Sequence, residues 1–333
     1  MKPAVVVLFN EPMREHEPSE AGVVSEVEDV VAALESCGKS VESRSMSSGS
    51  LLSTLGGLAE RRAGTVVFNL CEGLDGHSQW EPLLAGLLEI HGIRFTGNTA
   101  TTLSWALDKR VATAILRAAG VPTLEGWVFQ TASLADVPRT LPFPCIVKPV
   151  GEDGSMGITI ESVVRNVEEL RERVSWVVET YRQPALVERY LPGREFNMSV
   201  VGEGSGTRVL PAAEIVFEGY GAGEYRVLSH DAKWHVGSRD DLRTIPRCPA
   251  SVDERLGTTL ASLSLATYRA FGCRDYARID IRLDGDGTAY VIDVNPNPDI
   301  SRVAGLALAA AEAGFTYERL VNNMMETAWK RPL

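Results

Sequence analysis

The sequence is poor in cysteine, and its few cysteines follow no pattern. They are Cys37, Cys71, Cys145, Cys248 and Cys273, and no two of them form a C-x-x-C pair. An odd number of scattered cysteines excludes a disulfide framework and a thiolate zinc site. We expect all five to be reduced and mostly buried.

Long apolar runs and an excess of basic residues are also lacking. The apolar run at residues 4–9 is followed at once by the polar segment NEPMREHEPSE. It is too short for a signal sequence or a membrane span, so we expect a cytoplasmic protein. The 44 acidic residues outnumber the 33 basic ones, and the net charge of −11 disfavours a nucleic-acid partner. A few locally placed cations must then hold any bound phosphate.

Several common catalytic signatures are missing as well. The five histidines show neither H-x-x-x-H nor H-E-x-x-H spacing, so no histidine metal site is expected. There is no G-x-S-x-G motif, and no glycine-rich loop is followed by G-K-S or G-K-T. The sequence therefore gives no indication of a zincin, a serine hydrolase or a Walker-type NTPase.

The chain instead begins with an alternation of strand and helix patterns. A buried strand over residues 4–9 precedes a helix that we expect to run from Ser19, as N-cap, to a stop at Gly38. A second buried strand over residues 65–70 precedes a second helix over residues 83–90. A strand–helix–strand–helix start favours a parallel sheet.

Further along, one helix is predicted from an apolar stripe that ends at Gly120 and consists of Leu103, Leu107, Val111 and Ile115. The segment PALVERYLPGREFNMSVVG, residues 184–202, predicts two strands joined by an LPGRE turn. The last part of the chain is expected to form a larger mixed sheet. We place domain boundaries near residues 105 and 186, which gives the units 1–105, 106–186 and 187–333.

Two short strands near the C-terminus carry polar side chains at every second position. Arg278 and Asp280 alternate with apolar residues, as do Asp293 and Asn295 after a DGDG turn. Pairing across a four-residue loop would place Asp280 opposite Asp293, with Cβ atoms about 4.5–5.5 Å apart. Two carboxylates and an amide oxygen suit a hard cation such as Mg²⁺. The alternative is a solvent-facing strand whose acids are balanced by Arg278 and Arg282.

A glycine-rich loop lies in the middle of the chain. In FPCIVKPVGEDGSMG, residues 143–157, Lys148 ends an apolar strand and three glycines follow. Glycine backbone N–H groups can wrap an anion, and a strand-terminal lysine adds a point charge. Taken alone, a plain glycine-rich hairpin turn is the alternative. Lys109 and Lys233, taken singly, would be surface lysines.

In this order, these segments resemble the ATP-grasp superfamily, and within it the D-alanine–D-alanine ligase branch. The resemblance extends over nearly the whole sequence and rests on FNLCEGLDG, LLEIHGIRFTGNTATTLSWALDK, FPCIVKPVGEDGSMG, VERYLPGRE, RIDIRLD and VIDVNPNP. It implies a three-domain architecture of class α/β and α+β. An N-terminal parallel α/β (pre-ATP-grasp) domain would precede a central lid subdomain and a C-terminal subdomain, with ATP held between these two.

The resemblance also implies roles for individual residues. Glu188 to Leu191 would form the adenine-binding hinge, and Glu195 would bind the ribose. The implied metal ligands are Asp280, Asp293 and Asn295. The implied catalytic residues are Arg278 beside the oxyanion, Lys233 at the terminal phosphate, and Ser155. The complete implied ATP-binding set is Lys109, Lys148, Glu152, Gly154, Ser155, Gly157, Glu188, Arg189, Tyr190, Leu191, Glu195 and Lys233.

The activity implied by the resemblance is ADP-forming ligation of a carboxylate to an amine, with Mg²⁺ as cofactor and Mn²⁺ as the alternative. ATP phosphorylates the carboxylate, and an amine attacks the acyl phosphate to leave an amide or peptide bond. The partners would be small amino-acid-like substrates, and relatives suggest a homodimer. Two other functions stay open: a nucleotide-binding protein without ligase activity, and a carboxylate kinase.

The first departure from the family pattern lies near the N-terminus. The segment NEPMREHEPSEAGVVSE lacks the family's glycine- and serine-rich opening, whose glutamate meets the ammonium of the first substrate. Glu20 is the nearest candidate for that role. The alternatives are Glu11, Glu15 and Glu17.

Two further departures concern the cleft. Gly154 and Trp234 stand where the family has the serine and tyrosine of a substrate-side network. In NPNPDIS, Asp299 and Arg302 lie where the family binds the carboxylate of the second substrate, and an arginine can pair with a carboxylate. Glu72 is expected to shape the cleft wall, with substrate contact as the alternative. An altered specificity is therefore expected.

Overall fold

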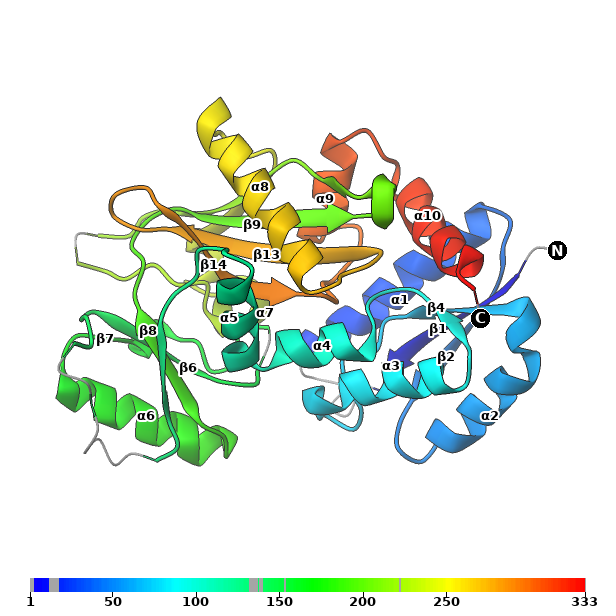
Figure 1. The fold of residues 1–333 in the computed structure, drawn as a ribbon, viewed down its shortest axis with the longest axis horizontal. Coiled ribbons are helices and arrows are strands. Elements are labelled where there is room, and N and C mark those ends of the chain that lie inside the picture. The colour runs from blue at the N-terminus through cyan, green and yellow to red at the C-terminus, as the bar shows by residue number, and fades with distance from the viewer. Residues whose placement is uncertain are drawn as a thin grey trace.

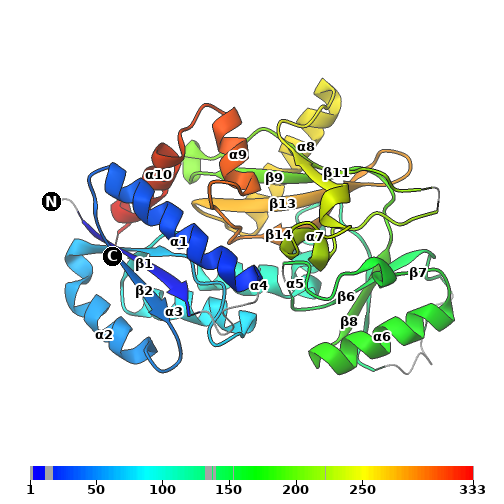
Figure 2. The same cartoon turned by 180° about the vertical axis from the view of Figure 1, so that it is seen from behind.

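The computed structural model describes residues 3–11, 18–131, 137, 140–152, 154–221 and 223–332, and gives the backbone alone for residues 18–21. In these residues the strands form three sheets, which Figure 1 shows from one side and Figure 2 from the other. One sheet comes from the N-terminal part of the chain, one from its middle, and the largest from its C-terminal part. None of the helices described is long and apolar enough to cross a lipid bilayer.

The N-terminal sheet is parallel, as the alternation of strands and helices predicts. Its order is β2-β1-β3-β4, with β1 (Ala4–Asn10), β2 (Ser40–Met46), β3 (Thr65–Asn69) and β4 (Arg94–Phe95). The helices of this part are α1 (Pro18–Ser36), α2 (Leu51–Arg61) and α3 (Glu81–Ile90). Val5 and Val7 of β1 enter one core, and Val6 and Leu8 enter another. Both faces of this sheet are therefore covered, which explains the unbroken apolar run.

Helix α1 begins earlier than predicted. It starts at Pro18, so Ser19 lies inside the helix and does not cap it. Its end agrees with the prediction, because α1 stops at Ser36 and Gly38 follows with a φ of 71°. A glycine with positive φ is a common way to end a helix.

The single helix predicted up to Gly120 is in fact two helices. α4 (Ala100–Leu107) and α5 (Lys109–Ala118) meet at Asp108, where the backbone is extended. The Asp108 carboxylate accepts a hydrogen bond from the backbone N of Arg110 at 2.9 Å and caps α5. The prediction was wrong because a short acidic side chain can replace backbone bonding at such a break. The new helix starts at Lys109, whose backbone N donates to Val150 O at 3.2 Å.

The central sheet is antiparallel and carries one long helix. Its order is β5-β8-β6-β7, with β5 (Gly126–Phe129), β6 (Cys145–Pro149), β7 (Val163–Val164) and β8 (Ala185–Arg189). Helix α6 (Val167–Tyr181) buries Leu170, Val174 and Val177 against it, as the apolar spacing predicts. Short 3₁₀ turns lie at Arg62–Gly64, Ser78–Trp80, Ile160–Ser162, Gly204–Gly206 and Asp241–Arg243.

The C-terminal sheet is the largest and is antiparallel. Its main order is β12-β11-β9-β13-β14, and β10 pairs with β9. The strands are β9 (Glu195–Val201), β10 (Arg208–Val209), β11 (Ala213–Phe217), β12 (Thr244–Arg247), β13 (Tyr276–Leu283) and β14 (Ala289–Asn295). The helices are α7 (His230–Trp234), α8 (Glu254–Ala270), α9 (Gly305–Glu312) and α10 (Tyr317–Lys330).

Residues 184–202 do form two strands, but the strands do not form a hairpin with each other. β8 belongs to the central sheet and β9 to the C-terminal sheet, and residues 190–194 join the two. The predicted boundary at residue 186 falls inside β8, which pairs with β5 and β6. The division into the units 1–105, 106–186 and 187–333 stays a prediction.

Candidate active site

A row of polar side chains crosses three neighbouring strands of the C-terminal sheet. Asp280 of β13 lies opposite Asp293 of β14, as predicted, and on its other side it lies opposite Asn197 of β9. The side-chain N of Asn197 donates to Asp280 Oδ1 at 2.7 Å. Two carboxylates side by side on one sheet repel each other, so the arrangement favours a cation between them.

The two aspartates pair as predicted, but the connection between their strands is longer than predicted and the register contains a shift. Five residues, Asp284–Thr288, connect β13 to β14, and Leu283 pairs with Ala289. That register alone would place Ile292 opposite Asp280. A bulge shifts the register by one residue, so that Ile292 is left over and Asp293 takes its place.

Four cationic side chains surround the Asp293 carboxylate. Burial acts to raise the pKa of Asp293, but the charges of Lys109, Lys148, Arg278 and Lys233 outweigh it and lower the pKa. These cations come from α5, β6, β13 and α7, which are distant from one another in the sequence. The fold therefore gathers on one carboxylate the three lysines that the sequence singled out.

Arg278 and Asp280 are joined by a bidentate ion pair within β13. Arg278 Nε donates to Asp280 Oδ1 at 2.8 Å, and a terminal guanidinium N donates to Oδ2 at 3.0 Å. Such a pair fixes the plane of the guanidinium group. Arg278 is thereby held at the edge of the row that contains both aspartates.

A cleft with an empty volume of about 680 Å³ opens between the central and C-terminal sheets. It is lined by Lys109, Ile146, Lys148, Pro149, Glu152, Ser155, Met156, Ile158, Glu195, Val227, Leu228, Lys233, Asp280, Arg282, Ile292 and Asp293. A smaller hollow of about 280 Å³ shares Lys109, Lys148, Ile292 and Asp293 with it and reaches Glu188. The cleft combines an apolar wall with the charged row, as a bound nucleotide would require.

The glycine loop is tied down over this cleft. Lys109 Nζ donates to the backbone O of Glu152 at 2.5 Å, and Gln183 donates to Glu152 Oε1 at 2.7 Å. Burial raises the pKa of the Glu152 carboxyl, although these two neighbours lower it. The contact of Gln183 with Glu152 went unpredicted, because it arises only where the chain returns from α6 to β8.

Three residues of the loop, Gly154, Ser155 and Gly157, have backbone angles that most side chains avoid. Ser155 has a φ of 62° and Gly157 a φ of 74°. A Cβ atom at Gly157 would lie 2.8 Å from Pro149 Cγ and 3.0 Å from Tyr181 Cε2. Glycine is therefore required at position 157 for both its angle and its size.

Two buried ion pairs lie along the cleft. Lys148 Nζ lies 2.7 Å from Glu188 Oε2, and Arg282 donates to Glu195 Oε2 at 2.8 Å. Burial raises the pKa of Glu195, although the charge of Arg282 opposes this shift. Arg282 was predicted only as a balancing charge on a solvent-facing strand. The structure buries it beneath the cleft, with contacts to Arg226 O and Tyr190 Oη.

The four residues of the predicted adenine hinge differ in where their side chains lie. Glu188 lines the smaller hollow. The side chain of Arg189 lies over the Tyr290 ring and 3.6 Å from Asp284. Tyr190 and Leu191 are buried, and Tyr190 Oη accepts from the backbone N of Arg226 at 2.9 Å. The buried side chains of Tyr190 and Leu191 leave the backbone as the part of these two residues that a ligand can meet.

Helix α7 contributes Lys233 to the cleft and Trp234 to the glycine loop. Burial and the charge of Arg278 lower the pKa of Lys233. The charges of Asp280, Asp293 and Glu195 act in the opposite direction. The indole Nε1 of Trp234 donates to Gly154 O at 3.0 Å. The two departures noted at Gly154 and Trp234 are therefore in direct contact with each other.

Among the side chains of α1 that the structure describes, Glu26 is the buried acidic one. The side chains of Glu15, Glu17 and Glu20 lie outside the described residues, and Glu11 is exposed. Glu26 is buried, and its Oε1 accepts from Ile300 N at 2.8 Å. Burial and the charges of Asp299 and Glu72 raise its pKa well above the usual range.

The sequence did contain a signal for Glu26. It lies three residues after Val23 and four before Val30, so it shares the apolar face of α1. A carboxylate at such a position is unusual and marks a buried polar site. The search for a glutamate in the polar N-terminal segment overlooked it.

Arg302, which the sequence suggested for a substrate carboxylate, is engaged by other residues of the chain. Its guanidinium donates to Glu318 at 2.9 Å, lies 3.4 Å from Asp29, and stacks over the Tyr317 ring. These contacts hold it on the exposed side of α1 and α10. Asp299 makes a local hydrogen bond, in which its Oδ1 accepts from Ser301 N at 2.7 Å.

The donors at the aspartate row fit a magnesium ion. They are two carboxylates and the amide O of Asn295, which accepts from Asn297 N at 2.9 Å and keeps a second lone pair. An all-oxygen set is the one that Mg²⁺ prefers. Asn297 in turn donates to Glu81 at 2.9 Å, so this end of the hairpin is anchored to α3.

Comparisons with known proteins agree with this arrangement. Residues 115–326 match a family model described as the D-Ala–D-Ala ligase C-terminus. An uncharacterized protein of Sinorhizobium fredii is 35% identical over 314 residues, which cover 91% of this chain and 87% of that protein. A D-alanine–D-alanine ligase of Anaeromyxobacter is 31% identical over 258 residues, which cover 76% and 77% of the two chains.

The fold is also that of a solved structure. The crystal structure of the D-alanine–D-alanine ligase of Bacillus anthracis complexed with ATP has a TM-score of 0.75 to this chain. The match covers 98% of this chain and 97% of that one at 20% identity, so it shows the fold alone. With the family model and the relatives, it leads to one conclusion. The chain belongs to the D-alanine–D-alanine ligase family, and it is an ATP-grasp protein and an ATP-dependent ligase that forms a C–N bond.

Proposed function

We propose that this protein joins the carboxyl group of one amino-acid-like molecule to the amine of another, with ATP converted to ADP and phosphate, and that its substrates are not two D-alanines. The observation that carries the proposal is the row of Asp280 and Asp293 under the charges of Lys148 and Lys233. The lysines supply positive charge for phosphate, and the two aspartates can bind a cation in the same cleft.

In the first step, the γ-phosphoryl group of ATP passes to the substrate carboxylate. Lys109, Lys148 and Lys233 would hold the phosphates, and Asp280, Asp293 and Asn295 would hold Mg²⁺. Bound there, Mg²⁺ supplies positive charge to the oxygens of the transferring group. Because this reaction needs little covalent help, positioned charges are the main requirement.

In the second step, the amine attacks the acyl phosphate. The guanidinium of Arg278, held in plane by Asp280, would donate hydrogen bonds to the oxyanion of the tetrahedral intermediate. The glycine loop, tied down through Glu152 and Gly154, would keep water away from the acyl phosphate. Phosphate then leaves and the amide remains.

The case for altered specificity rests on the substrate side. Glu26 and Glu72 with Asp299 form an acidic group, and Arg302 is engaged by Asp29 and Glu318. An acidic surrounding favours an ammonium group on the substrate. The arginine expected to pair with a substrate carboxylate is directed elsewhere. We therefore propose that the amine substrate carries an additional positive charge or lacks a free carboxylate beside its amine.

The proposal is tested by supplying the purified full-length protein with ATP, Mg²⁺ and a panel of L- and D-amino acids, diamines and amino-acid amides. ADP release that needs both an acid and an amine, with a condensed product in the mass spectrum, is the expected result. ADP release without amine, trapped as a hydroxamate by hydroxylamine, would instead indicate a carboxylate kinase. ATP binding without turnover on any pair would favour a nucleotide-binding protein.

We also propose that the chain forms a homodimer through its N-terminal part. Leu83 and Ile90 of α3 are 60% and 81% exposed, and apolar side chains of this size favour burial at an interface. Sedimentation of the wild-type chain and of Ile90→Glu tests this. A monomer in both cases would contradict the proposal.

A further inference from the structure

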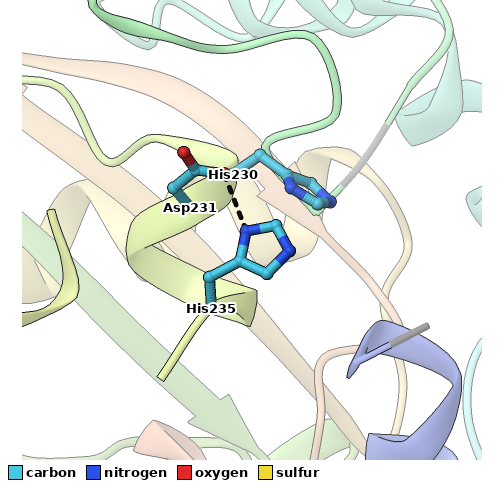
Figure 3. Close-up of side chains that lie close together, drawn as sticks. All are labelled: His230, Asp231 and His235. Atoms are coloured by element: carbon cyan, nitrogen blue, oxygen red, sulfur yellow. Dashed lines mark hydrogen bonds and ion pairs between the residues drawn. The ribbon is translucent and has the colours of Figure 1, made fainter. Parts of the chain in front are cut away.

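Three potential metal ligands meet at helix α7. They are His230, Asp231 and His235, shown in Figure 3, and within the part of the chain that the structure describes they form a group whose ligand atoms lie within 4.8 Å of one another. Nδ1 of His235 lies 2.8 Å from Asp231 Oδ1, one helical turn earlier. The ring centroids of His230 and His235 are 5.7 Å apart.

This group went unpredicted because its histidines are five positions apart. The H-x-x-x-H and H-E-x-x-H spacings place two histidines four positions apart, on one face of a regular helix. Here α7 ends at Trp234, and His235 has left the helical conformation, with a φ of −105° and a ψ of 82°. The end of the helix brings the second histidine back toward the first.

The group can close around a metal ion with small side-chain movements. Donors bound to Zn²⁺ at about 2.0–2.1 Å in a tetrahedron lie about 3.3 Å apart. Donors as far as 4.8 Å apart must therefore close by roughly 1.5 Å, and the pair at 2.8 Å must open by about 0.5 Å. Asp231 and His235 are exposed, so rotation of their side chains is not restricted by packing.

A further carboxylate lies near the group, and the group lies apart from the cleft. From this segment the cleft is lined by Val227, Leu228 and Lys233, and neither histidine is among its lining residues. Glu161 lies close enough to Asp231 for that charge to act on its carboxyl group. A second carboxylate near the group further favours a cation.

We propose that His230, Asp231 and His235 bind a transition-metal dication of the Zn²⁺ class, at a site separate from the all-oxygen seat of Asp280 and Asp293. Two imidazoles and one carboxylate select Zn²⁺, Co²⁺ or Ni²⁺ over Mg²⁺. The two sites therefore take different ions when both ions are present. This inference stands whether or not the proposed ligase reaction is correct.

Such an ion would fix the position of α7. It would connect the first residue of this short helix with the residue after its last. The backbone N of His230 donates to Ile158 O at 3.0 Å, and Trp234 donates to Gly154 O. Both bonds reach the glycine loop. Binding of the ion is therefore expected to change the environment of the Trp234 indole.

The experiment is a calorimetric titration of Zn²⁺ into the metal-free full-length protein in a solution that contains excess Mg²⁺. We expect one tight equivalent per chain. The double variant His230→Ala/His235→Ala and the single variant Asp231→Asn should each weaken it by at least about tenfold. His91→Ala, which removes another exposed histidine at the end of α3, should leave the affinity unchanged.

Cobalt distinguishes this site from binding by cysteine. The Co²⁺ complex should show visible d–d bands without the near-ultraviolet charge-transfer band of a thiolate. Near-ultraviolet circular dichroism with ATP added verifies that each variant is folded. The proposal is overturned if the wild-type chain binds no Zn²⁺, if both variants bind as tightly as wild type, or if the cobalt complex shows thiolate charge transfer.

Discussion

The indole Nε1 of Trp234 donates to the backbone O of Gly154 at 3.0 Å, and this bond joins α7 to the glycine loop. Trp234→Phe keeps an aromatic ring but removes the donor. One lost hydrogen bond is worth about 1 kcal/mol, or about fivefold in the closed population of the loop. We expect a higher KM for ATP and more ATP hydrolysis per amide formed. An unchanged ratio of hydrolysis to ligation would show that this bond does not hold the loop closed.

Removing the charge of Asp293 should abolish activity. Asp293→Asn keeps the size of the side chain but removes the carboxylate that faces Lys148 and Lys233. We expect turnover to fall by a factor on the order of a thousand, since charge stabilisation carries phosphoryl transfer. Asp286→Asn, in the exposed turn of the same hairpin, is the matched control and should be fully active. Equal activity of the two variants would remove the metal assignment.

An alanine at position 157 should destabilise the chain. Gly157→Ala introduces both a strained φ of 74° and contacts of 2.8 Å and 3.0 Å with Pro149 and Tyr181. Gly120→Ala is the control for strain alone, because its φ is 69° and nothing lies within 4 Å. We expect the Gly120 variant to lose about 1 kcal/mol and the Gly157 variant about 2–4 kcal/mol in denaturant unfolding. Equal losses would show that the loop accommodates the methyl group.

The buried carboxyl of Glu26 should make stability depend on pH. Its pKa in the folded chain is raised above the usual 4.5, so the folded state binds its proton more tightly than the unfolded state does. Stability from this group is then present below pH 4.5 and is lost as the pH rises through the folded pKa. Glu26→Gln should therefore raise the Tm at pH 7 more than at pH 5, by calorimetry.

Glu28→Gln, on the exposed side of α1, serves as the control for Glu26 and should change the Tm equally at both pH values. The same pair of variants tests the substrate side. We expect Glu26→Gln, but not Glu28→Gln, to weaken the binding of the amine substrate. A Tm of Glu26→Gln below wild type at pH 7 would contradict the unfavourable burial of this charge.

Two arginines should respond to substitution in opposite ways. Arg302→Ala removes a side chain held by Glu318 and Asp29 on the exposed side, so kcat/KM should change by less than about twofold. Arg278→Lys keeps a charge but loses the planar fork held by Asp280, and kcat should fall about 10²- to 10³-fold. A large loss for Arg302→Ala would restore it as a substrate residue.

The predictions that succeeded were those in which a strict spacing forces a spatial relationship. Alternation in β13 and β14 fixed which side chains share a face, and this placed Asp280 opposite Asp293 although the loop length was misjudged. The glycine loop was located because three glycines directly follow the strand that ends near Lys148. The assignment of ATP and metal roles to single residues stays a prediction.

The features that escaped the sequence depend on contacts between distant segments. Nothing near Glu26 in the chain indicates that it will meet Asp299, and nothing near Gln183 indicates Glu152. The break at Asp108 escaped because an apolar stripe continues across it. His230 and His235 were missed because the helix between them ends early.

The two aspartates stand on the C-terminal sheet, while Lys148 stands on the central sheet, and the short segment 190–194 leads from one sheet to the next. If the central sheet moved away from its neighbour, the ammonium of Lys148 would move out of reach of Asp293. The proton affinity of that carboxylate would then climb, and its hold on a divalent ion would weaken. Opening of the enzyme would thus weaken the binding of the cation and of the nucleotide together, so that one hinge motion would release both.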